Sequence, residues 1–373
     1  MKRAAIAGKA LLLATLPLAP LYADPTDDEL DPIVEKAALA ARASSRLIVP
    51  VPLAGPQIGA GLAVGAVWFY SPRGSERPWT TGVAGLASSN GSWGVGGQHS
   101  MTLGGNRYRV DITAAYGQFN TQFFGVGSEA GQTNESIGIT QTPLLFQGQA
   151  TMRVANNLFL GPRLRYLDMQ TVVRDPASVP PGFDISDIEE ERHIVAIGPV
   201  VNFDHTDGSL NPRSGTKING QWLFSLTALG SSATYNKANL TINHYVDVDD
   251  RTVVGFRGSL CAASGEAPFF DLCLFGSSAN LRGYPNGQFR DRASWAVQTE
   301  WRRHLGGRWG VVAFAGLGGV APSLGDIGDS TLLPAAGGGV RFEVSSEYHV
   351  NVRVDGAVGR NSQALYLSLG EAF

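Results

Sequence analysis

The stretch YHVNVRVD, residues 348–355, decides the fold of this chain. Its aromatic and β-branched residues alternate one by one with polar and charged residues. Successive side chains of a β-strand point to opposite faces of the sheet, so this segment has one apolar face and one ionic face. The pattern predicts a strand that lies between a nonpolar environment and a polar one.

The same alternation continues over the chain from about residue 47, and it separates into sixteen segments. The expected strands are 46–53, 58–70, 79–88, 92–102, 106–117, 138–154, 157–172, 191–204, 214–227, 233–247, 251–263, 293–304, 309–320, 335–345, 347–358 and 364–373. With both ends of the chain in the periplasm, short periplasmic turns alternate with longer outside connections. The long connections are 118–137, 173–190, 264–292 and 321–334.

A soluble β-sandwich is the alternative, because its strands alternate as well. A transmembrane barrel is favoured by segments of about ten residues, by aromatic residues such as Trp68, Trp93 and Trp309 near segment ends, and by an inner face with charges of both signs. Only 16% of the residues are charged, against about 25% in soluble domains. The expected fold class is all-β: a transmembrane antiparallel β-barrel of sixteen strands, with one long extracellular loop folded inward.

The N-terminus predicts export. Lys2 and Arg3 precede a short apolar stretch, and Ala23 suits a cleavage site, so residues 1–23 are interpreted as a signal peptide. Residues 24–46 predict a short periplasmic helix or leader, and residues 47–373 the barrel domain. The expected location is the outer membrane of a Gram-negative bacterium.

Cys261 and Cys273 are the two cysteines of the chain. Export would place them in an oxidising compartment, where thiols are seldom left free. A disulfide is therefore favoured over two unpaired, buried thiols. Closing the loop between them would stabilise the fold by roughly 3 kcal/mol in the chain-entropy picture.

The most informative motif is formed by Leu281, Arg282, Gly283 and Tyr284, in the long connection 264–292. Here the chain resembles the BamA/TamA superfamily of bacterial surface antigens. Their sixteen-stranded barrels fold the sixth extracellular loop inward, with an Arg-Gly-aromatic tip. Residues 204–215, 268–276, 337–342 and 369–373 resemble other parts of the same barrels. The resemblance covers the chain after about residue 46 and implies a protein that inserts or translocates proteins or lipids.

Two features depart from the family pattern. The family usually carries periplasmic POTRA repeats, and residues 24–46 are too few for a domain of about 50 residues, so a barrel-only member is expected. The family also offers an aspartate to the loop arginine where this chain has Gly316. Since a buried charge needs a partner, Glu300 is the candidate partner of Arg282. The alternative is an arginine that meets only water or carbonyl groups in a loose loop.

The pattern indicates no enzyme, no cofactor and no metal site. Two functions remain: insertion or translocation through a weak seam between the first and last strands, or a passive pore, open or plugged. The seam residues would be Pro50 and Pro52, which lack N–H donors, together with Phe373; alternatively, the prolines merely begin a strand. The expected partners are outer-membrane lipid, client outer-membrane or secreted proteins, and a separate periplasmic protein. A net charge of −3 gives no reason to expect nucleic acid.

Overall fold

A computed structural model describes residues 46–55, 59–70, 72, 79–133, 135–179, 188, 190–208, 211–276, 280–345 and 350–373 of the 373-residue chain. The expected signal peptide (1–23) and almost all of the expected leader (24–46) lie outside these residues. The sequence-based expectations about them therefore remain predictions.

The described part is built almost entirely of strands, which are long because β-branched and aromatic residues recur at every second position. The strands are β1 (Arg46–Gly55), β2 (Gly59–Tyr70), β3 (Trp79–Ser88), β4 (Trp93–Leu103), β5 (Tyr108–Phe123), β6 (Ile137–Ala155), β7 (Leu158–Val173), β8 (Glu190–Thr206), β9 (Gly215–Ser225), β10 (Tyr235–Asp249), β11 (Thr252–Gly265), β12 (Cys273–Phe275), β13 (Phe289–Asp291), β14 (Ala293–Gly306), β15 (Trp309–Ala321), β16 (Leu333–Ser345), β17 (Val350–Gly359) and β18 (Ser362–Leu369). The helical turns are α2 (Ser128–Thr133), η1 (Pro176–Ser178), η3 (Thr227–Leu229), η4 (Phe269–Asp271) and η5 (Leu324–Asp329). No helix in this part of the chain is long and apolar enough to cross a membrane.

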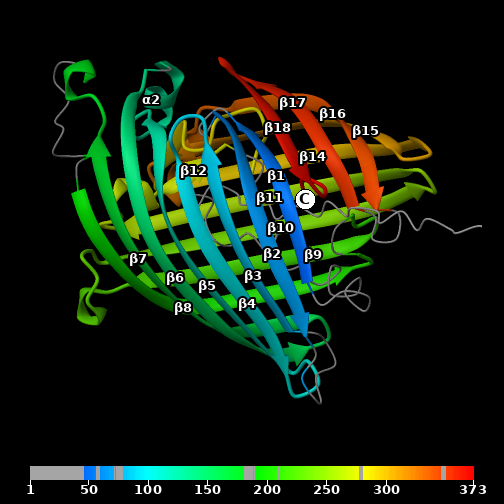
Figure 1. Cartoon of the computed structure of the whole chain (residues 1–373). Coiled ribbons are helices and arrows are strands. Elements are labelled where there is room, and N and C mark those ends of the chain that lie inside the picture. Colours follow the sequence, from blue (N-terminus) through cyan, green and yellow to red (C-terminus); the bar gives the residue numbers. More distant parts are fainter. Residues whose placement is uncertain are drawn as a thin grey trace, which may run out of the picture.

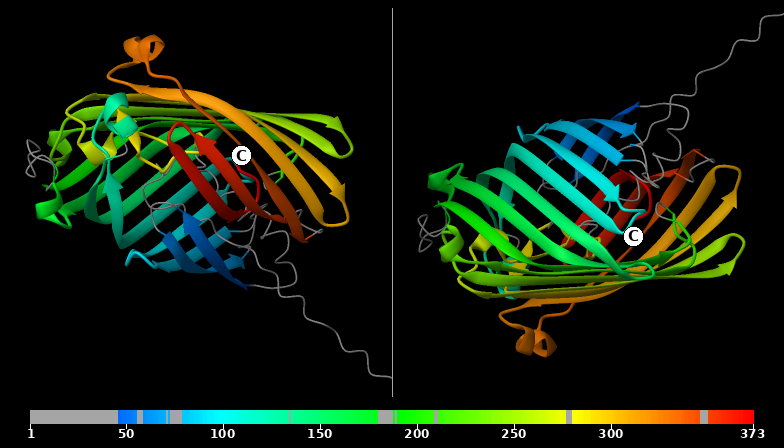
Figure 2. Two further views of the ribbon diagram at one scale, coloured as in Figure 1. Left: turned by 90° about the horizontal axis from the view of Figure 1, so that it is seen from above. Right: turned by 90° about the horizontal axis from the view of Figure 1, so that it is seen from below.

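Sixteen strands form one antiparallel sheet in chain order, from β1 to β11 and from β14 to β18. The short strands β12 and β13 pair with each other in a separate two-stranded sheet. The large sheet curls round on itself, so that β1 and β18 lie next to each other (Figures 1 and 2). Within the described residues, no ladder joins these two strands, whereas every other neighbouring pair is hydrogen-bonded. The sheet therefore forms a barrel with one unladdered seam.

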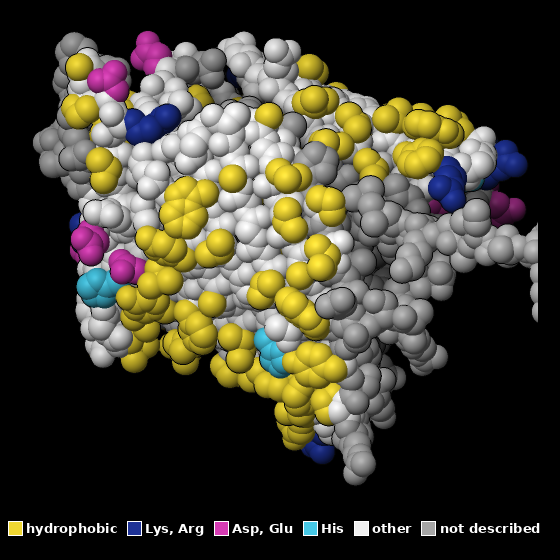
Figure 3. Space-filling view, viewed as in Figure 1, with side chains coloured by type: hydrophobic (Ala, Val, Ile, Leu, Met, Phe, Trp, Pro, Cys, Tyr) yellow, Lys and Arg dark blue, Asp and Glu magenta, His cyan; other side chains and the backbone are white. Residues whose placement is uncertain are grey.

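The two faces of the sheet differ as the alternation predicts. In β17, Arg353 and Asp355 are buried on the inner face, while Val354 and Val358 are exposed on the outer face. Figure 3 shows hydrophobic side chains spread over the outer surface, with the charged side chains near its margins. This outer surface suits lipid, and the polar inner face lines a lumen.

The structure confirms the all-β class and the sixteen-stranded antiparallel sheet, and it corrects individual boundaries. β5 continues to Phe123, six residues beyond the expected end at residue 117. β18 ends at Leu369, although the alternation predicted a strand to residue 373. The physical reason is Gly370, whose φ of 74° lies in the left-handed region and turns the chain off the strand.

Candidate functional site

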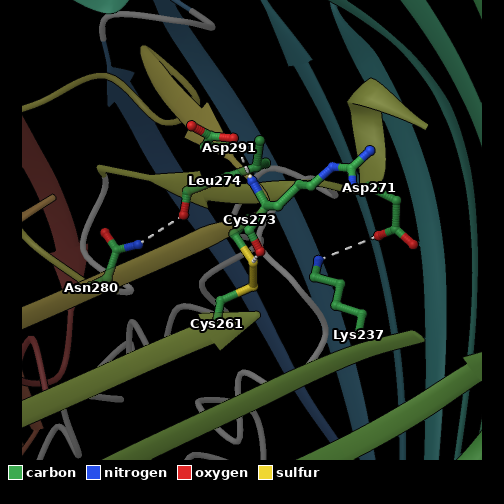
Figure 4. The surroundings of a disulfide bond; sticks show 8 residues. Lys237, Cys261, Asp271, Cys273, Leu274, Asn280 and Asp291 are labelled. Atoms are coloured by element: carbon green, nitrogen blue, oxygen red, sulfur yellow. Dashed lines mark hydrogen bonds and ion pairs between the residues drawn. A yellow bond between two sulfur atoms is a disulfide. The ribbon is translucent and has the colours of Figure 1, made fainter. Parts of the chain in front are cut away.

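The candidate site is the long connection between β11 and β14, residues 266–292, which enters the lumen. A disulfide joins Cys261 of β11 to Cys273 of β12, with 5.6 Å between their Cα atoms (Figure 4). β12 pairs with β13, with Cys273 opposite Asp291. The disulfide therefore attaches the small two-stranded sheet of the loop to the barrel wall.

A buried ion cluster around Asp271 holds the loop near this disulfide, and Figure 4 shows its Lys237–Asp271 pair. Asp271 accepts from Arg165 Nη2 of β7 at 2.6 Å and from Lys237 Nζ of β10 at 3.4 Å, and Tyr235 Oη also donates to it. Burial by itself would raise the pKa of the Asp271 carboxyl, but the charges of Arg165 and Lys237 and the hydrogen bonds from Arg165 and Tyr235 lower it to about 2. Asp271 is thus held ionised between two strands of the wall.

Aromatic side chains form the interior of the loop. The rings of Phe275, Tyr284 and Phe289 pack together, with centroids 5.6 Å apart for Phe275–Tyr284, 6.2 Å for Phe275–Phe289 and 5.6 Å for Tyr284–Phe289. Leu281 is buried in the same cluster. This packing gives the loop a hydrophobic core of its own, and it fixes the position of the tip that follows Leu281.

Arg282 lies at the tip and is completely buried, with a relative exposure of 0%. Its Nη1 donates to Asp355 Oδ2 of β17 at 2.8 Å, its Nη2 donates to Glu300 Oε2 of β14, and its Nε donates to Gln298 Oε1 at 3.3 Å. The guanidinium plane also covers the ring of Phe314 of β15, with Cζ 3.4 Å from the centroid. Arginine suits this position because its planar fork serves two carboxylates and an aromatic face at once.

The two carboxylates are shared with further arginines of the wall. Glu300 accepts from Arg302 Nε at 2.6 Å, and Arg341 pairs with Asp355. Buried ions are costly to desolvate unless each has partners with good geometry. The network meets this condition by alternating positive and negative groups across β14, β16 and β17.

The rest of the tip rests on the last three strands. Tyr284 Oη donates to Pro334 O of β16 at 2.6 Å and accepts from Arg360 N at 2.9 Å. Gly283 N donates to Tyr366 Oη of β18 at 3.0 Å. The wall makes room for the ring of Tyr284 at Gly359, where an added Cβ would lie 2.5 Å from Tyr284 Cζ.

The partner of Arg282 proposed from the sequence, Glu300, is thus in contact with it, but sequence reasoning missed the second carboxylate. At Gly316, an added Cβ would lie 2.6 Å from Leu281 Cδ1, so the loop fills the place where the family aspartate would stand. Asp355 supplies a carboxylate from β17 instead. The alternation in residues 348–355 placed Asp355 on the inner face, but only the curvature of the sheet and the inward path of the loop bring it to Arg282.

At the seam, Pro50 and Pro52 stand in β1 opposite Val64 and Leu62 of β2. Alternate residues of a strand direct their N–H positions to the same side, so both prolines remove a donor from one edge of β1. The β1–β2 register is continuous from Arg46 to Gly55, and prolines in sheets favour the free side of an edge strand. Both observations favour the edge facing β18 as the one on which the two N–H donors are missing.

Phe373 was wrongly assigned to the seam. β18 ends before it, and its side chain is buried in the lumen, where its ring lies 6.5 Å from that of Tyr245 and 5.0 Å from Arg257 Cζ. A turn at Gly370, where φ is 74°, moves it off the strand. Figure 2 shows this end of the chain inside the ring in the views from above and from below.

Fold and site together define a transmembrane β-barrel with an inward loop clamped by buried ions. The model of the Omp85 superfamily domain matches residues 101–320. This is more than half of the chain, which therefore belongs to the Omp85 superfamily, and the resemblance found from the loop motif is confirmed.

Solved structures with the same fold include BamA from Haemophilus ducreyi lacking POTRA domains 1–3, with a TM-score of 0.63 and 13% identity, over 87% of this chain and 70% of that one. CdiB from Escherichia coli has a TM-score of 0.60 and 11% identity, over 87% and 62%. CdiB from Acinetobacter baumannii has a TM-score of 0.56 and 12% identity, over 87% and 59%. The chain thus spans less than two thirds of either CdiB structure. None of the curated proteins compared with it matches.

Proposed function

We propose that this protein inserts or translocates client proteins at the outer membrane of a Gram-negative bacterium, through the seam between β1 and β18. The observation that carries the proposal is the unladdered contact of these two strands in a sheet whose other neighbours are all paired among the described residues. Backbone groups without a ladder partner are a template for pairing with another chain. An extended client segment can use both edges in this way. The proposal assigns the protein no catalytic activity.

The inward loop supports the same function, because it occupies part of the wide lumen. A barrel of sixteen strands is wide enough for an aqueous channel. Here the buried Arg282, Tyr284 and Phe289 occupy part of that space. Clients would therefore pass along the seam rather than through the lumen, with lipid on the apolar outer face and a separate periplasmic protein delivering them.

The test is to lock the seam chemically. Ile48 of β1 and Leu365 of β18 are both exposed on the outside, and cysteines at these positions are treated with bis-maleimide reagents of graded length until a bridge forms across the seam. The matched control bridges Leu240 and Leu260, which face each other across the regular β10–β11 ladder and are also exposed. Quantitative outer-membrane proteomics in cells that depend on each variant is the measurement.

We expect selective loss of some barrel or secreted proteins when the seam is bridged, and none when the control pair is bridged. An outer membrane that keeps its normal proteins after bridging, and after depletion of the protein, would reject client handling. A passive pore would then be the remaining function, and conductance in planar bilayers would measure it.

A further inference from the structure

The segment after β18, residues 370–373, leaves the wall and crosses into the lumen. Gly370 has a φ of 74° and its N donates to Asn351 O of β17 at 2.8 Å. Ala372 is buried and Phe373 is 7% exposed. The 370–373 segment is therefore an internal element with a site of its own.

Glu371 fixes the beginning of this segment. Its Oε2 accepts from Arg341 Nε at 2.6 Å, and its Oε1 accepts from Asn351 Nδ2 at 2.7 Å. Arg302 Nε lies 3.9 Å from the same carboxylate. Arg341 and Arg302 also serve Glu300, which binds the loop tip. The segment and the loop tip therefore share one ion cluster.

Phe373 fixes the other end. Arg257 Nη1 donates to Ala372 O at 3.3 Å, and Arg302 Nη2 donates to Phe373 O. The ring of Phe373 lies 5.0 Å from Arg257 Cζ and 5.7 Å from Arg302 Cζ, and it packs against Tyr245. Guanidinium groups beside an aromatic ring attract it, more strongly where water is excluded.

These contacts lie on β10, β11 and β14, which are four to six positions away from β18 in the strand order. β18 is thus attached to the wall in two ways: by its ladder with β17, and by a segment that reaches across the lumen. An outward movement of β18 at the seam must withdraw Phe373 from its site or stretch the segment.

We propose that residues 370–373 are an internal ligand of this lumen site and tether β18, so that the site holds the seam closed. The site takes an aromatic side chain beside the guanidinium groups of Arg257, Arg282 and Arg302. Arg257 and Arg302 also donate to main-chain oxygens of the segment. The inference concerns the seam used in the proposed function, but its test measures the seam without a client. A failed client assay and a failed tether are therefore distinguishable.

The test measures the distance across the seam in the full chain, reconstituted in phosphatidylcholine–phosphatidylglycerol vesicles. Spin labels are placed on cysteines at Ile48 and Leu365, with exposures of 61% and 55%. The native cysteines do not interfere because they are joined in the disulfide. Double electron–electron resonance gives the distance distribution between β1 and β18.

Gly255→Val is the variant that crowds the ring of Phe373 in its site without changing the segment itself. A Cβ added at Gly255 of β11 would lie 3.1 Å from Phe373 Cε2, and the larger side chain extends further toward the ring. Gly258→Val on the same strand is the control, because nothing lies within 4 Å of a Cβ there. Glu371→Gln is a second, independent variant that removes the charge at the other end of the segment. Folding of each variant is checked by gel electrophoresis of heated and unheated samples, because a folded barrel migrates differently from the heat-unfolded chain.

We expect Gly255→Val and Glu371→Gln each to shift the distribution to longer and broader distances, with Gly258→Val at the wild-type distances. Wild-type distances in either of the two test variants would overturn the proposal, because it requires both ends of the segment. An equal shift in Gly258→Val would overturn it as well.

Discussion

Arg282 determines where the loop tip lies, because its guanidinium binds two carboxylates from strands that are not neighbours. Glu300 belongs to β14 and Asp355 to β17, and both are completely buried. A buried ion pair adds little net stability, but the loss of one member leaves its partners charged and unpaired. Replacing Arg282 alone should therefore destabilise the loop tip more than replacing Arg282, Glu300 and Asp355 together by nonpolar residues.

Replacing Arg282 with methionine should destabilise the barrel by about 3–5 kcal/mol, because Glu300 and Asp355 lose a buried partner. Urea unfolding in lipid vesicles measures the free energy. Trypsin cleavage at Arg290 and Arg292, in the same loop, reports whether the tip has left its site. We expect both lower stability and faster cleavage.

Arg213→Met is the matched control for this substitution. Arg213 Nη2 lies 2.6 Å from Asp247 Oδ1, but both side chains are partly exposed, and such pairs contribute about 0–1 kcal/mol. Equal losses of stability for the two arginines would contradict the special role of the buried cluster. Arg282→Lys should recover only part of the loss, because an ammonium group lacks the fork that serves both acids.

Asp271 should make the attachment of the loop depend on pH. Its pKa in the folded protein, about 2, lies below the ordinary value of 3.8. The ionised form is therefore stabilised by folding, by about 2 kcal/mol. This contribution is complete above about pH 4 and is lost as the pH falls through about 2.

The measurement compares wild type with Asp271→Asn from pH 6 to pH 2. The difference in unfolding free energy between them should be constant down to about pH 4 and then decrease. If wild type instead becomes more stable relative to Asp271→Asn as the pH falls, the folded protein stabilises the neutral carboxyl rather than the carboxylate. Asp326→Asn in the outer helical turn η5, where the carboxylate is exposed and accepts from Ser323, is the control.

At the scale of strands, the sequence predicts most of the barrel because each strand has two environments. Alternation in residues 348–355 is enough to place Arg353 and Asp355 inward. It does not show that Asp355 reaches Arg282, because that distance depends on the closure of the sheet and on the path of the loop. The alternation also predicted a last strand that continues through Phe373, because residues 364–369 give no sign that the chain turns off the strand at Gly370.

The strand β17 also allows a test of how closely wall and loop fit. Gly359→Ala should shift the ring of Tyr284, since the new Cβ would lie 2.5 Å from Tyr284 Cζ. Forcing an extra carbon into a packed site costs about 1–3 kcal/mol. Urea unfolding and trypsin cleavage of the loop should both report the change.

Gly356→Ala, three residues earlier in β17, provides the comparison, because nothing lies within 4 Å of a Cβ at that position. We expect its stability and its loop cleavage to equal those of wild type. If the two alanine variants behave alike, the loop tip does not rest on β17 in the membrane, and the contact between Tyr284 and Gly359 is not what holds it.

At the scale of the whole molecule, the lumen is rich in polar contacts between strands, whereas the seam between β1 and β18 has no ladder. The loop tip and the 370–373 segment occupy part of the lumen, where buried ion pairs and hydrogen bonds join them to β11, β14, β16 and β17. A further hydrogen bond joins the loop tip to β18. β1 and β2 contribute none of these described contacts, and β1 lies beside β18 without a ladder. Among the described contacts, the β18 side of the seam is restrained by the 370–373 segment, and β1 is joined to the wall by its ladder with β2.

The double substitution of Pro50 and Pro52 by valine tests whether the seam lacks N–H donors. It returns two N–H donors to one edge of β1, and β-branched residues suit a strand. If that edge faces β18, the seam can form ladder bonds. Hydrogen exchange of the backbone should then slow in β1 and β18, and client insertion should decrease.

Hydrogen exchange in β2 shows which edge of β1 carries the two restored N–H groups. The β1–β2 register is already complete at Val64 and Leu62, so exchange in β2 should stay at its wild-type rate. If β2 slows and β18 does not, the prolines face the ladder rather than the seam, and their effect is to weaken the pairing of β1 with the wall. The two outcomes thus separate a seam that lacks donors from a first strand that is loosely attached.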